Sequence, residues 1–171
     1  MPKRGFNTPF AKKLVEVNFW RIEQAIAAKK LDPKKAIDAD VLVAAGVGAV
    51  ATQNVTDPNL GPMLLDLMSQ GLSARAAIDS IIRERPFIEY RQLTAVDSKG
   101  NSASWSGKHI LGTHGVSEER DCVAAGNLLK SPDLPKVMTD YFARNATEHL
   151  AERLLRSLEA GLESGGEEGP V

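Results

Sequence analysis

The sequence predicts an α+β protein in which helices and strands form separate layers. Short runs of small and β-branched residues are typical of buried strands, and a strong turn signal separates two of the predicted strands. Longer segments place apolar residues at helical spacing. Strands and helices that follow one another in this way favour a layered α/β architecture. The chain has 171 residues, of which 43% are hydrophobic and 25% are charged, an ordinary composition for one globular domain with or without an appendage.

The N-terminal part begins with an arm, residues 1–13, that is basic and rich in turn-forming residues. Residues 14–19 alternate in the manner of a strand, and residues 21–30 carry apolar positions at helical spacing. A second short helix is expected from Asp38 to Ala45, because Gly46 then provides a stop signal.

The next part predicts one strand and two helices. Residues 46–53 are small and β-branched, which indicates a buried strand approached closely by its neighbours. Thr56 opens a helix that ends near Gly71. Ser73 is expected to cap a further helix, which Pro86 ends.

A hairpin follows these helices. The strands are expected at residues 90–96 and 102–106, because Asp97–Asn101 between them has the composition of a turn. Cys122–Ala125 is apolar and predicts another buried strand.

Two amphipathic helices are expected to close the chain, at residues 134–144 and 147–163. The second carries leucines on one face, at positions Leu150, Leu154, Leu155 and Leu158. Residues 164–171 are rich in glycine and charge, and we expect them to form a disordered tail.

Charge divides the chain unevenly. Nine Lys and Arg face three acids up to Lys35, whereas twelve Lys and Arg face nineteen acids beyond it, so the net charge of −1 conceals a basic front and an acidic remainder. A basic segment of this kind favours contact with nucleic acid. The change of character is centred on Ala45–Gly48 and suggests two ancestries in one chain.

Several classes of protein are disfavoured by simple counts. No apolar run reaches the roughly 18–20 residues that a membrane helix needs, so no membrane partner is expected. The start, Met1–Gly5, is followed by charged residues and not by the apolar core of a secretory signal. Cys122 is the single cysteine, which excludes an internal disulfide. A cytoplasmic protein without a cofactor is the expectation.

A first resemblance covers the N-terminal segment. Its motifs are Pro2–Asn7, Val15–Asn18 with Arg21-Ile22, and Leu42–Val47. Over residues 1–46 the chain resembles the C-terminal part of the bacterial large-subunit ribosomal protein numbered fifteen. The resemblance implies a basic arm that contacts RNA phosphates, to which Lys and Arg are attracted without regard to base sequence. The residues implied in RNA binding are Lys3, Arg4, Lys12 and Lys13.

A second resemblance covers residues 45–171. Its motifs are Ala45–Gln53, Glu89–Leu93 with Val96-Asp97, Ala125–Asn127, and Leu150–Leu155 with Leu158–Gly161. They resemble an uncharacterised bacterial family of Ntn-hydrolase-like proteins, a domain of unknown function with the αββα sandwich fold. Members begin with a β-hairpin, which the ribosomal-protein-like segment replaces here, and they continue into further strands. The resemblance therefore implies an incomplete Ntn-hydrolase-like αββα sandwich.

Together the two resemblances predict a chimera of three parts. Residues 1–46 form the ribosomal-protein-like basic segment, residues 47–163 the Ntn-hydrolase-like α/β domain, and residues 164–171 the disordered tail.

Amide-bond hydrolysis is the activity that the second resemblance implies, but its nucleophile is in question. Ntn-type catalysis uses an N-terminal Thr, Ser or Cys whose own α-amine is the general base. Removal of Met1 exposes Pro2, which has no side-chain nucleophile. Cleavage before Thr52 would create a threonine terminus, so Thr52 is the candidate catalytic residue, with a structural threonine as the alternative.

Polar residues near predicted strand ends are the candidates for substrate binding. Gln53 and Asn54 follow the first buried strand, where α/β proteins often place ligand-contacting groups. Glu89 immediately precedes the next predicted strand and Arg91 lies at its start, and pairing across the sheet surface is the alternative reading of these two residues.

A metal site is not predicted. His109 and His114 lie near Asp121 and Cys122, and these are residue types that bind zinc, but their spacing matches no standard site. Solvated loop histidines and a buried small cysteine are the alternative.

Three hypotheses of function follow from these patterns. The first is an Ntn-hydrolase-like protein with an unknown small-molecule or peptide substrate, whose catalysis is lost or unproven because its N-terminal hairpin is replaced. The second is an RNA-binding module that uses the basic arm. The third is a non-catalytic structural fusion that forms homo-oligomers through unpaired sheet edges.

Overall fold

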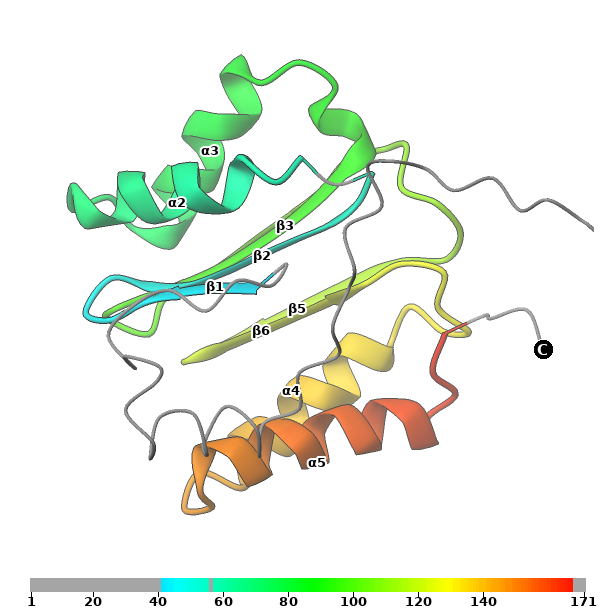
Figure 1. The fold of residues 1–171 in the computed structure, drawn as a ribbon. Coiled ribbons are helices and arrows are strands. Elements are labelled where there is room, and N and C mark those ends of the chain that lie inside the picture. Colours follow the sequence, from blue (N-terminus) through cyan, green and yellow to red (C-terminus); the bar gives the residue numbers. More distant parts are fainter. Residues whose placement is uncertain (1–40, 56, 168–171) are drawn as a thin grey trace, which may run out of the picture. The chain divides into compact units, whose positions relative to one another are not determined.

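The computed structural model describes residues 41–55 and 57–167 (Figure 1). The chain divides into two units, residues 1–35 and 36–171, and the described residues belong to the second. The strand and helix predicted within residues 14–30, and the four basic residues assigned to RNA binding, lie outside the described residues. No helix in the described part is long and apolar enough to cross a membrane.

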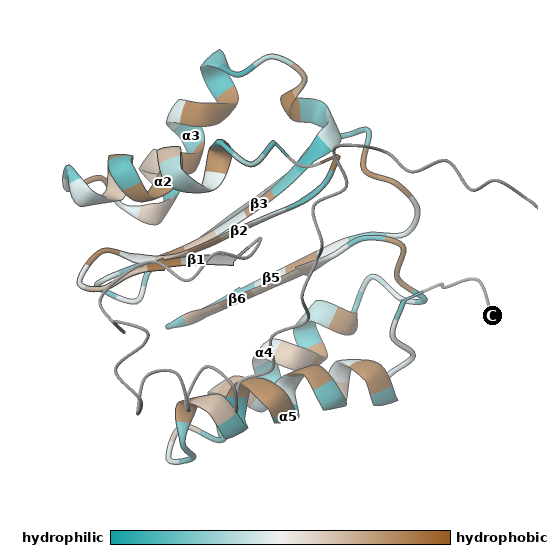
Figure 2. Ribbon diagram, in the orientation of Figure 1, coloured by the Kyte–Doolittle hydropathy of each residue, from teal (hydrophilic) through white to brown (hydrophobic). Residues whose placement is uncertain are grey.

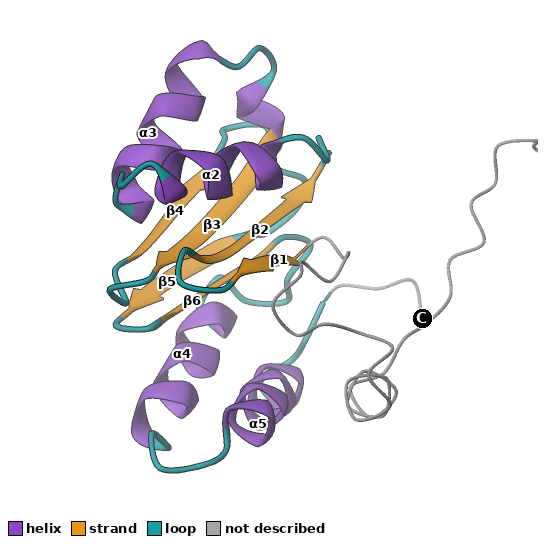
Figure 3. Cartoon of the chain, turned by 60° about the vertical axis from the view of Figure 1, so that its left-hand side comes forward, coloured by secondary structure: helices purple, strands orange, loops and turns teal. Residues whose placement is uncertain are grey.

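Four layers make up the described part, as the views in Figures 1 and 3 show. Two helices cover one face of a four-stranded antiparallel sheet, and a two-stranded antiparallel sheet lies against its other face, with two further helices beyond. The strands are β1 (Val41–Ala44), β2 (Gly48–Asn54), β3 (Arg91–Asp97), β4 (Ser102–Ser106), β5 (Gly115–Glu119) and β6 (Cys122–Gly126). The helices are α2 (Leu60–Ser69), α3 (Ala74–Glu84), the 3-10 turn η1 (Ile88–Tyr90), α4 (Leu134–Arg144) and α5 (Leu150–Glu163). The predicted α+β class is confirmed.

The segment before Gly46 is a strand and not the predicted helix. Strand β1 pairs antiparallel with β2, with Ala44 opposite Gly48, and a three-residue loop joins them. Gly46 has a φ of +76° in this loop, a left-handed conformation that glycine adopts without strain. The run Val41–Ala44 is apolar throughout and carries no period of its own, so pairing with β2 decides its structure. A hairpin therefore opens the described sheet, and Leu42–Val47, a motif of the ribosomal resemblance, supplies one of its strands and the turn.

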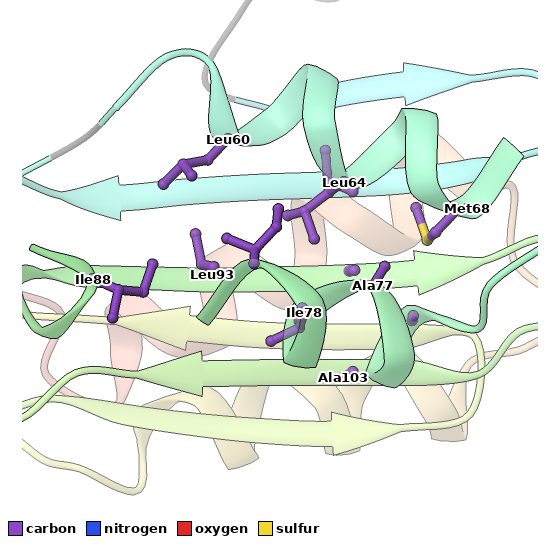
Figure 4. Packing of buried hydrophobic residues seen from close by; sticks show 12 residues of the cluster. Leu60, Leu64, Met68, Ala77, Ile78, Ile88, Leu93 and Ala103 are labelled. Carbon is purple, nitrogen blue, oxygen red and sulfur yellow. The ribbon is translucent and has the colours of Figure 1, made fainter. Parts of the chain in front are cut away.

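The core lies between α2, α3 and the four-stranded sheet. Figure 4 shows Leu60 and Leu64 of α2 and Ile78 of α3 directed toward Leu93 of β3, and all four side chains are fully buried. Val50 of β2 belongs to the same cluster. The predicted cap of α3 is present, because the Ser73 side chain accepts a hydrogen bond from the amide of Ala76.

The two-stranded sheet contains a strand, β5, that the sequence does not predict. Strands β5 and β6 pair across the two-residue loop Arg120-Asp121, in which Asp121 has a φ of +64°. Strand β5 also blocks the edge of the larger sheet. The Glu118 carboxylate accepts hydrogen bonds from the backbone amide and hydroxyl of Ser104 at 2.7 and 2.6 Å, while Arg75 donates to the Ser104 carbonyl at 3.0 Å. Charged side chains thus occupy the backbone groups that an added strand would use.

Helix α4 covers the two-stranded sheet, and α5 packs against α4. Helix α4 has the bounds that the sequence predicts, whereas α5 begins three residues later than expected. The leucines predicted on one face of α5 are exposed, and Figure 2 shows the hydrophobic segments along this helix. Residues 164–167, the first part of the predicted tail, are held by backbone hydrogen bonds and by a bridge between Leu129 and Glu167. The amides of Gly165 and Gly166 bond to carbonyls of the last turn of α5 and so complete its C-terminus.

Candidate functional site

The candidate site lies at one end of the four-stranded sheet, where β2 ends and β3 begins. Asn54 is the register partner of Arg91, and Gln53 is the partner of Gln92. Glu89 lies in η1, immediately before β3. The structure therefore brings together all four residues, Gln53, Asn54, Glu89 and Arg91, that the sequence assigns to substrate binding.

The local chain path explains this arrangement. Pro86 follows α3 and prevents its continuation. Phe87 then has a φ of +59°, an uncommon left-handed conformation for a residue with a bulky side chain, and turns the chain into η1 and β3. The turn leaves the Phe87 side chain 72% exposed beside the end of the sheet.

Asn54 ties three segments together. Its Nδ2 donates to the carbonyl of Tyr90 at 2.6 Å. Its Oδ1 accepts from the amide of Leu111 at 3.4 Å and from Nδ2 of Asn127 at 3.5 Å. The side chain therefore joins the end of β2 to η1 and to the loops around β5 and β6.

Gln53 belongs to a polar connection between the two sheets. Its Nε2 donates to Oε1 of Gln92, which is fully buried. Gln92 in turn donates to Oγ of Ser106 at 2.9 Å and to the carbonyls of Gly115 and Gly126 at 3.3 and 3.4 Å. A buried amide with this many partners links the layers rigidly, because an unmade hydrogen bond there is costly.

Glu89 closes the loop that follows β4. Its Oε2 accepts from the backbone amide of Lys108 at 3.0 Å, and its carbonyl accepts from the amide of His109 at 2.9 Å. A Cβ at Gly107 would lie 2.2 Å from the Glu89 carbonyl oxygen, so this close approach requires glycine. Within the described residues Glu89 and Arg91 form no ion pair.

Arg91 differs from the other three residues. It is half-buried, its Nη1 is buried without a hydrogen-bond partner, and its guanidinium has no ion-pair partner in the described part of the chain. A pocket of about 430 Å³ lies beside it, lined by Val55, Phe87, Tyr90 and Arg91. The Tyr90 ring stacks on His109 with 4.8 Å between ring centroids. The sequence singles out Arg91 but not these aromatic residues, whose only signal is the proline-containing end of α3.

Thr52, the candidate nucleophile, lies apart from Gln53. It is 6% exposed in the middle of β2, opposite Leu93. Side chains alternate along a strand, so Thr52 shares the face of Val50, which packs under α2 and α3, whereas Gln53 faces the second sheet. Asn54 has a φ of +69° and departs from this alternation, and its side chain bonds to the loops around β5 and β6.

Cys122 and His114, the titratable residues considered for metal binding, have contacts within the fold. Burial raises the pKa of the Cys122 thiol to about 11, so it is protonated and unreactive at neutral pH. His114 lies near the Gly112 carbonyl. Among the described residues no group of three or more His, Cys, Asp or Glu converges on a possible metal position.

Comparison with curated proteins gives partial matches to one ribosomal protein. The chain is 51% identical to large ribosomal subunit protein uL15 of Phenylobacterium zucineum over 83 residues, which is 46% of this chain and 51% of that protein. It is 62% identical to uL15 of Maricaulis maris over 47 residues, 28% of this chain and 30% of that protein. With uL15 of Methylobacterium sp. (strain 4-46) the identity is 36% over 103 residues, 60% of this chain and 64% of that protein. The chain thus spans between 30% and 64% of the length of these relatives.

Comparison of structures and family models gives a second match. A crystal structure of a Silicibacter pomeroyi protein, described as a DUF1028 member, superposes with a TM-score of 0.69 at 25% identity, covering 74% of this chain and 56% of that one. The model named "Family of unknown function (DUF1028)" matches residues 35–171. This match starts ten residues before the predicted resemblance and includes all of β1. The family model and the solved fold agree, and the uL15 similarity is the one expected for a chimera. The chain therefore belongs to the DUF1028 family of unknown function.

Proposed function

We propose that this chain is an Ntn-hydrolase-like domain that binds a small-molecule or peptide substrate and does not hydrolyse it. The observation that carries the proposal is a pocket of about 430 Å³ at this end of the sheet, whose wall includes Arg91, with Gln53, Asn54 and Glu89 on the adjoining segments. The hollow is open to solvent, and most of its lining is apolar with one cation, Arg91, beside it. The order helix, sheet, sheet, helix supports the Ntn-hydrolase-like assignment.

The surroundings of Thr52 support the absence of hydrolysis. A working Ntn nucleophile needs a free α-amine as its base. The amide of Thr52 is part of a peptide bond inside β2, and its neighbour Ala51 has register partners on both sides, Val41 and Thr94. Cleavage between Ala51 and Thr52 would divide a central strand of the sheet.

An intact-mass measurement combined with an amidase assay tests this proposal. We expect the full chain mass without cleavage before Thr52, and no release of product from chromogenic amides and peptides. Thr52→Val keeps the β-branched shape and removes the hydroxyl, so it is the matched control. A fragment that begins at Thr52, with hydrolysis that Thr52→Val abolishes, would contradict the proposal.

RNA binding through the basic segment is a second candidate, which the uL15 similarity favours. Phosphate attraction would come from Lys3, Arg4, Lys12 and Lys13. Such binding weakens steeply with salt, since each phosphate contact releases counterions. We expect ribosomal RNA fragments to bind at low salt and to dissociate as salt rises.

The matched comparison uses two quadruple charge reversals to glutamate. One changes Lys3, Arg4, Lys12 and Lys13, and the other changes four exposed cations elsewhere, Lys99, Lys108, Arg120 and Arg144. Loss of RNA binding with the first set alone supports the candidate. Equal loss with both sets would show only general electrostatic attraction, and no binding at low salt would eliminate the candidate.

A further inference from the structure

The pocket beside Arg91 contains a cation that the described protein does not neutralise. Two other charged groups at this end of the sheet have partners: Arg85 donates from Nε to Asp57 at 3.1 Å, and Glu89 accepts from the Lys108 amide at 3.0 Å. Arg91 is half-buried with Nη1 unpartnered. Withdrawing a guanidinium from water without a partner is unfavourable, and a carboxylate matches its planar fork of donors.

The other walls of the pocket are apolar and partly flat. Phe87 is 72% exposed and Val55 50% exposed, although both are large hydrophobic residues. The Tyr90 ring contacts His109 in a tilted arrangement. The left-handed backbone at Phe87 costs on the order of 1 kcal/mol, and strain of this kind is frequently retained where it serves binding.

We propose that this pocket binds a carboxylate attached to a flat apolar group, with Arg91 holding the carboxylate and Phe87 and Tyr90 contacting the ring. The inference rests on the proposed binding function and names its ligand class. A carboxylate is favoured because its two oxygens match the planar donors of a single guanidinium, and two nearby donors are already bonded within the fold. Asn54 Nδ2 donates to the Tyr90 carbonyl, and the Lys108 amide donates to Glu89. One guanidinium suffices for a single negative charge, whereas a phosphate would leave most of its oxygens without donors.

Binding of phenylacetate, phenylacetamide and cyclohexylacetate to the full chain tests the inference. The first two share the same ring and differ in the charge of the head group, and the first and third share the carboxylate and differ in whether the ring is flat and aromatic. We expect phenylacetate to bind at least about tenfold more tightly than the amide, as one charge-assisted hydrogen-bond pair allows. Its addition should shift the backbone amide signals of Val55, Phe87, Tyr90 and Arg91, and cyclohexylacetate should bind more weakly.

Two variants and a matched control complete the experiment. Arg91→Met should reduce phenylacetate affinity at least about tenfold and leave the amide unaffected. Phe87→Ala should weaken the affinity for phenylacetate several-fold. The position is exposed, so the melting temperature should change only slightly. Arg83→Met is the control, since Arg83 is exposed and bonded only within α3, to Asp79 and Ser80, and it should bind like the parent chain.

The outcomes separate the two proposals. Equal binding of acid and amide, or unchanged acid binding in Arg91→Met, overturns the carboxylate inference and leaves a binding pocket. Absence of any shift at the pocket amides with all three compounds removes the inference and the binding part of the proposed function together. Thr52-dependent hydrolysis would contradict only the non-catalytic part. If Arg91→Met does not fold, the acid–amide comparison on the parent chain and the Phe87→Ala result still decide.

Discussion

Strand β3 begins with a cation, Arg91, and ends with an anion, Asp97, and the fold treats the two charges in opposite ways. Asp97 is 8% exposed and its carboxylate accepts hydrogen bonds from several donors. Arg91 is half-buried, and its guanidinium has no counterion in the described part of the chain. A charge that is fully hydrogen-bonded holds a fold together, whereas one without partners is available to a ligand.

The Asp97 end shows how thoroughly a charge can be satisfied. Oδ1 accepts from the amides of Lys99 and Asn101 at 2.9 and 3.0 Å, and Oδ2 from the side chain of Asn101 at 2.9 Å. Oδ2 also accepts from the amide of Ala74 at 3.2 Å, at the first residue of α3. The carboxylate therefore joins the β3–β4 turn to the positive end of a core helix.

Replacement of Asp97 by alanine should give the largest effect. The change leaves the amides of Ala74, Lys99 and Asn101 without their acceptor, and we expect the free energy of unfolding to fall by about 2–3 kcal/mol. Urea denaturation measures this. Asp66→Ala, at an exposed position on α2 where the carboxylate contacts only Gln70, is the control and should stay within about 0.5 kcal/mol of the parent. An equal loss in both variants would refute the special role of Asp97.

The hydrogen bonds of Asp97 should also make the free energy of unfolding depend on pH in the acid range. Burial raises the pKa of Asp97, but hydrogen bonds from Asn101, Ala74 and Lys99 outweigh this and bring the net pKa below its ordinary value. A lowered pKa contributes stability that is complete above the unfolded value, near 4, and is lost as the pH falls through the folded value. Stability should therefore decline as the pH falls below about 4. Asp97→Asn should have a shallower decline in the same pH range, and an unchanged slope would contradict the assignment.

A third case, Glu118, lies between these extremes. Its carboxylate is bonded to Ser104 and Arg75, but the pair is partly exposed, with side chains 34% and 49% accessible. Glu118→Gln retains the shape and removes the charge, and we expect a loss of about 0.5–1 kcal/mol in urea denaturation. Glu119→Gln on the same strand, whose contact with Lys136 is 4.0 Å long, is the matched control and should change stability less. Sedimentation of Glu118→Gln also reports whether the freed edge of β4 associates.

Much of the fold could be predicted because its signals are local. The Ser73 cap, the bounds of α4 and the turn at Asp97–Gly100 each depend on residues close in sequence. Strand β1 could not be predicted, because its apolar run suits a helix or a strand and only its pairing with β2 decides. Strand β5 escaped prediction because it is short and polar, and its stability comes from β6 and from contacts across the layers.

The position of the candidate site could be predicted from the sequence. Which of its residues bond within the fold and which one lines the pocket could not. Polar residues at strand ends indicated Gln53, Asn54, Glu89 and Arg91, and the register brings them together. Sequence does not say which of them bonds to its own fold, because the partners Gln92, Tyr90 and Lys108 lie on other segments. The aromatic wall at Phe87 depends on one left-handed residue that has no glycine or asparagine to indicate it.

Replacement of Arg91 should have the smallest effect on stability. Its sign should be opposite to that of the effect of replacing Asp97. Arg91→Met keeps the length and the apolar stem of the side chain and removes an unpartnered buried donor, so no native hydrogen bond within the described residues is lost. We expect the free energy of unfolding to stay constant or to rise by up to about 0.5 kcal/mol, measured by urea denaturation without ligand. Phenylacetate should then raise the melting temperature of the parent chain but not that of the variant, since only a ligand that binds the native state stabilises it. A loss above about 1 kcal/mol in Arg91→Met would mean that Arg91 is bonded within the fold as Asp97 is, and the contrast between the two ends of β3 would disappear.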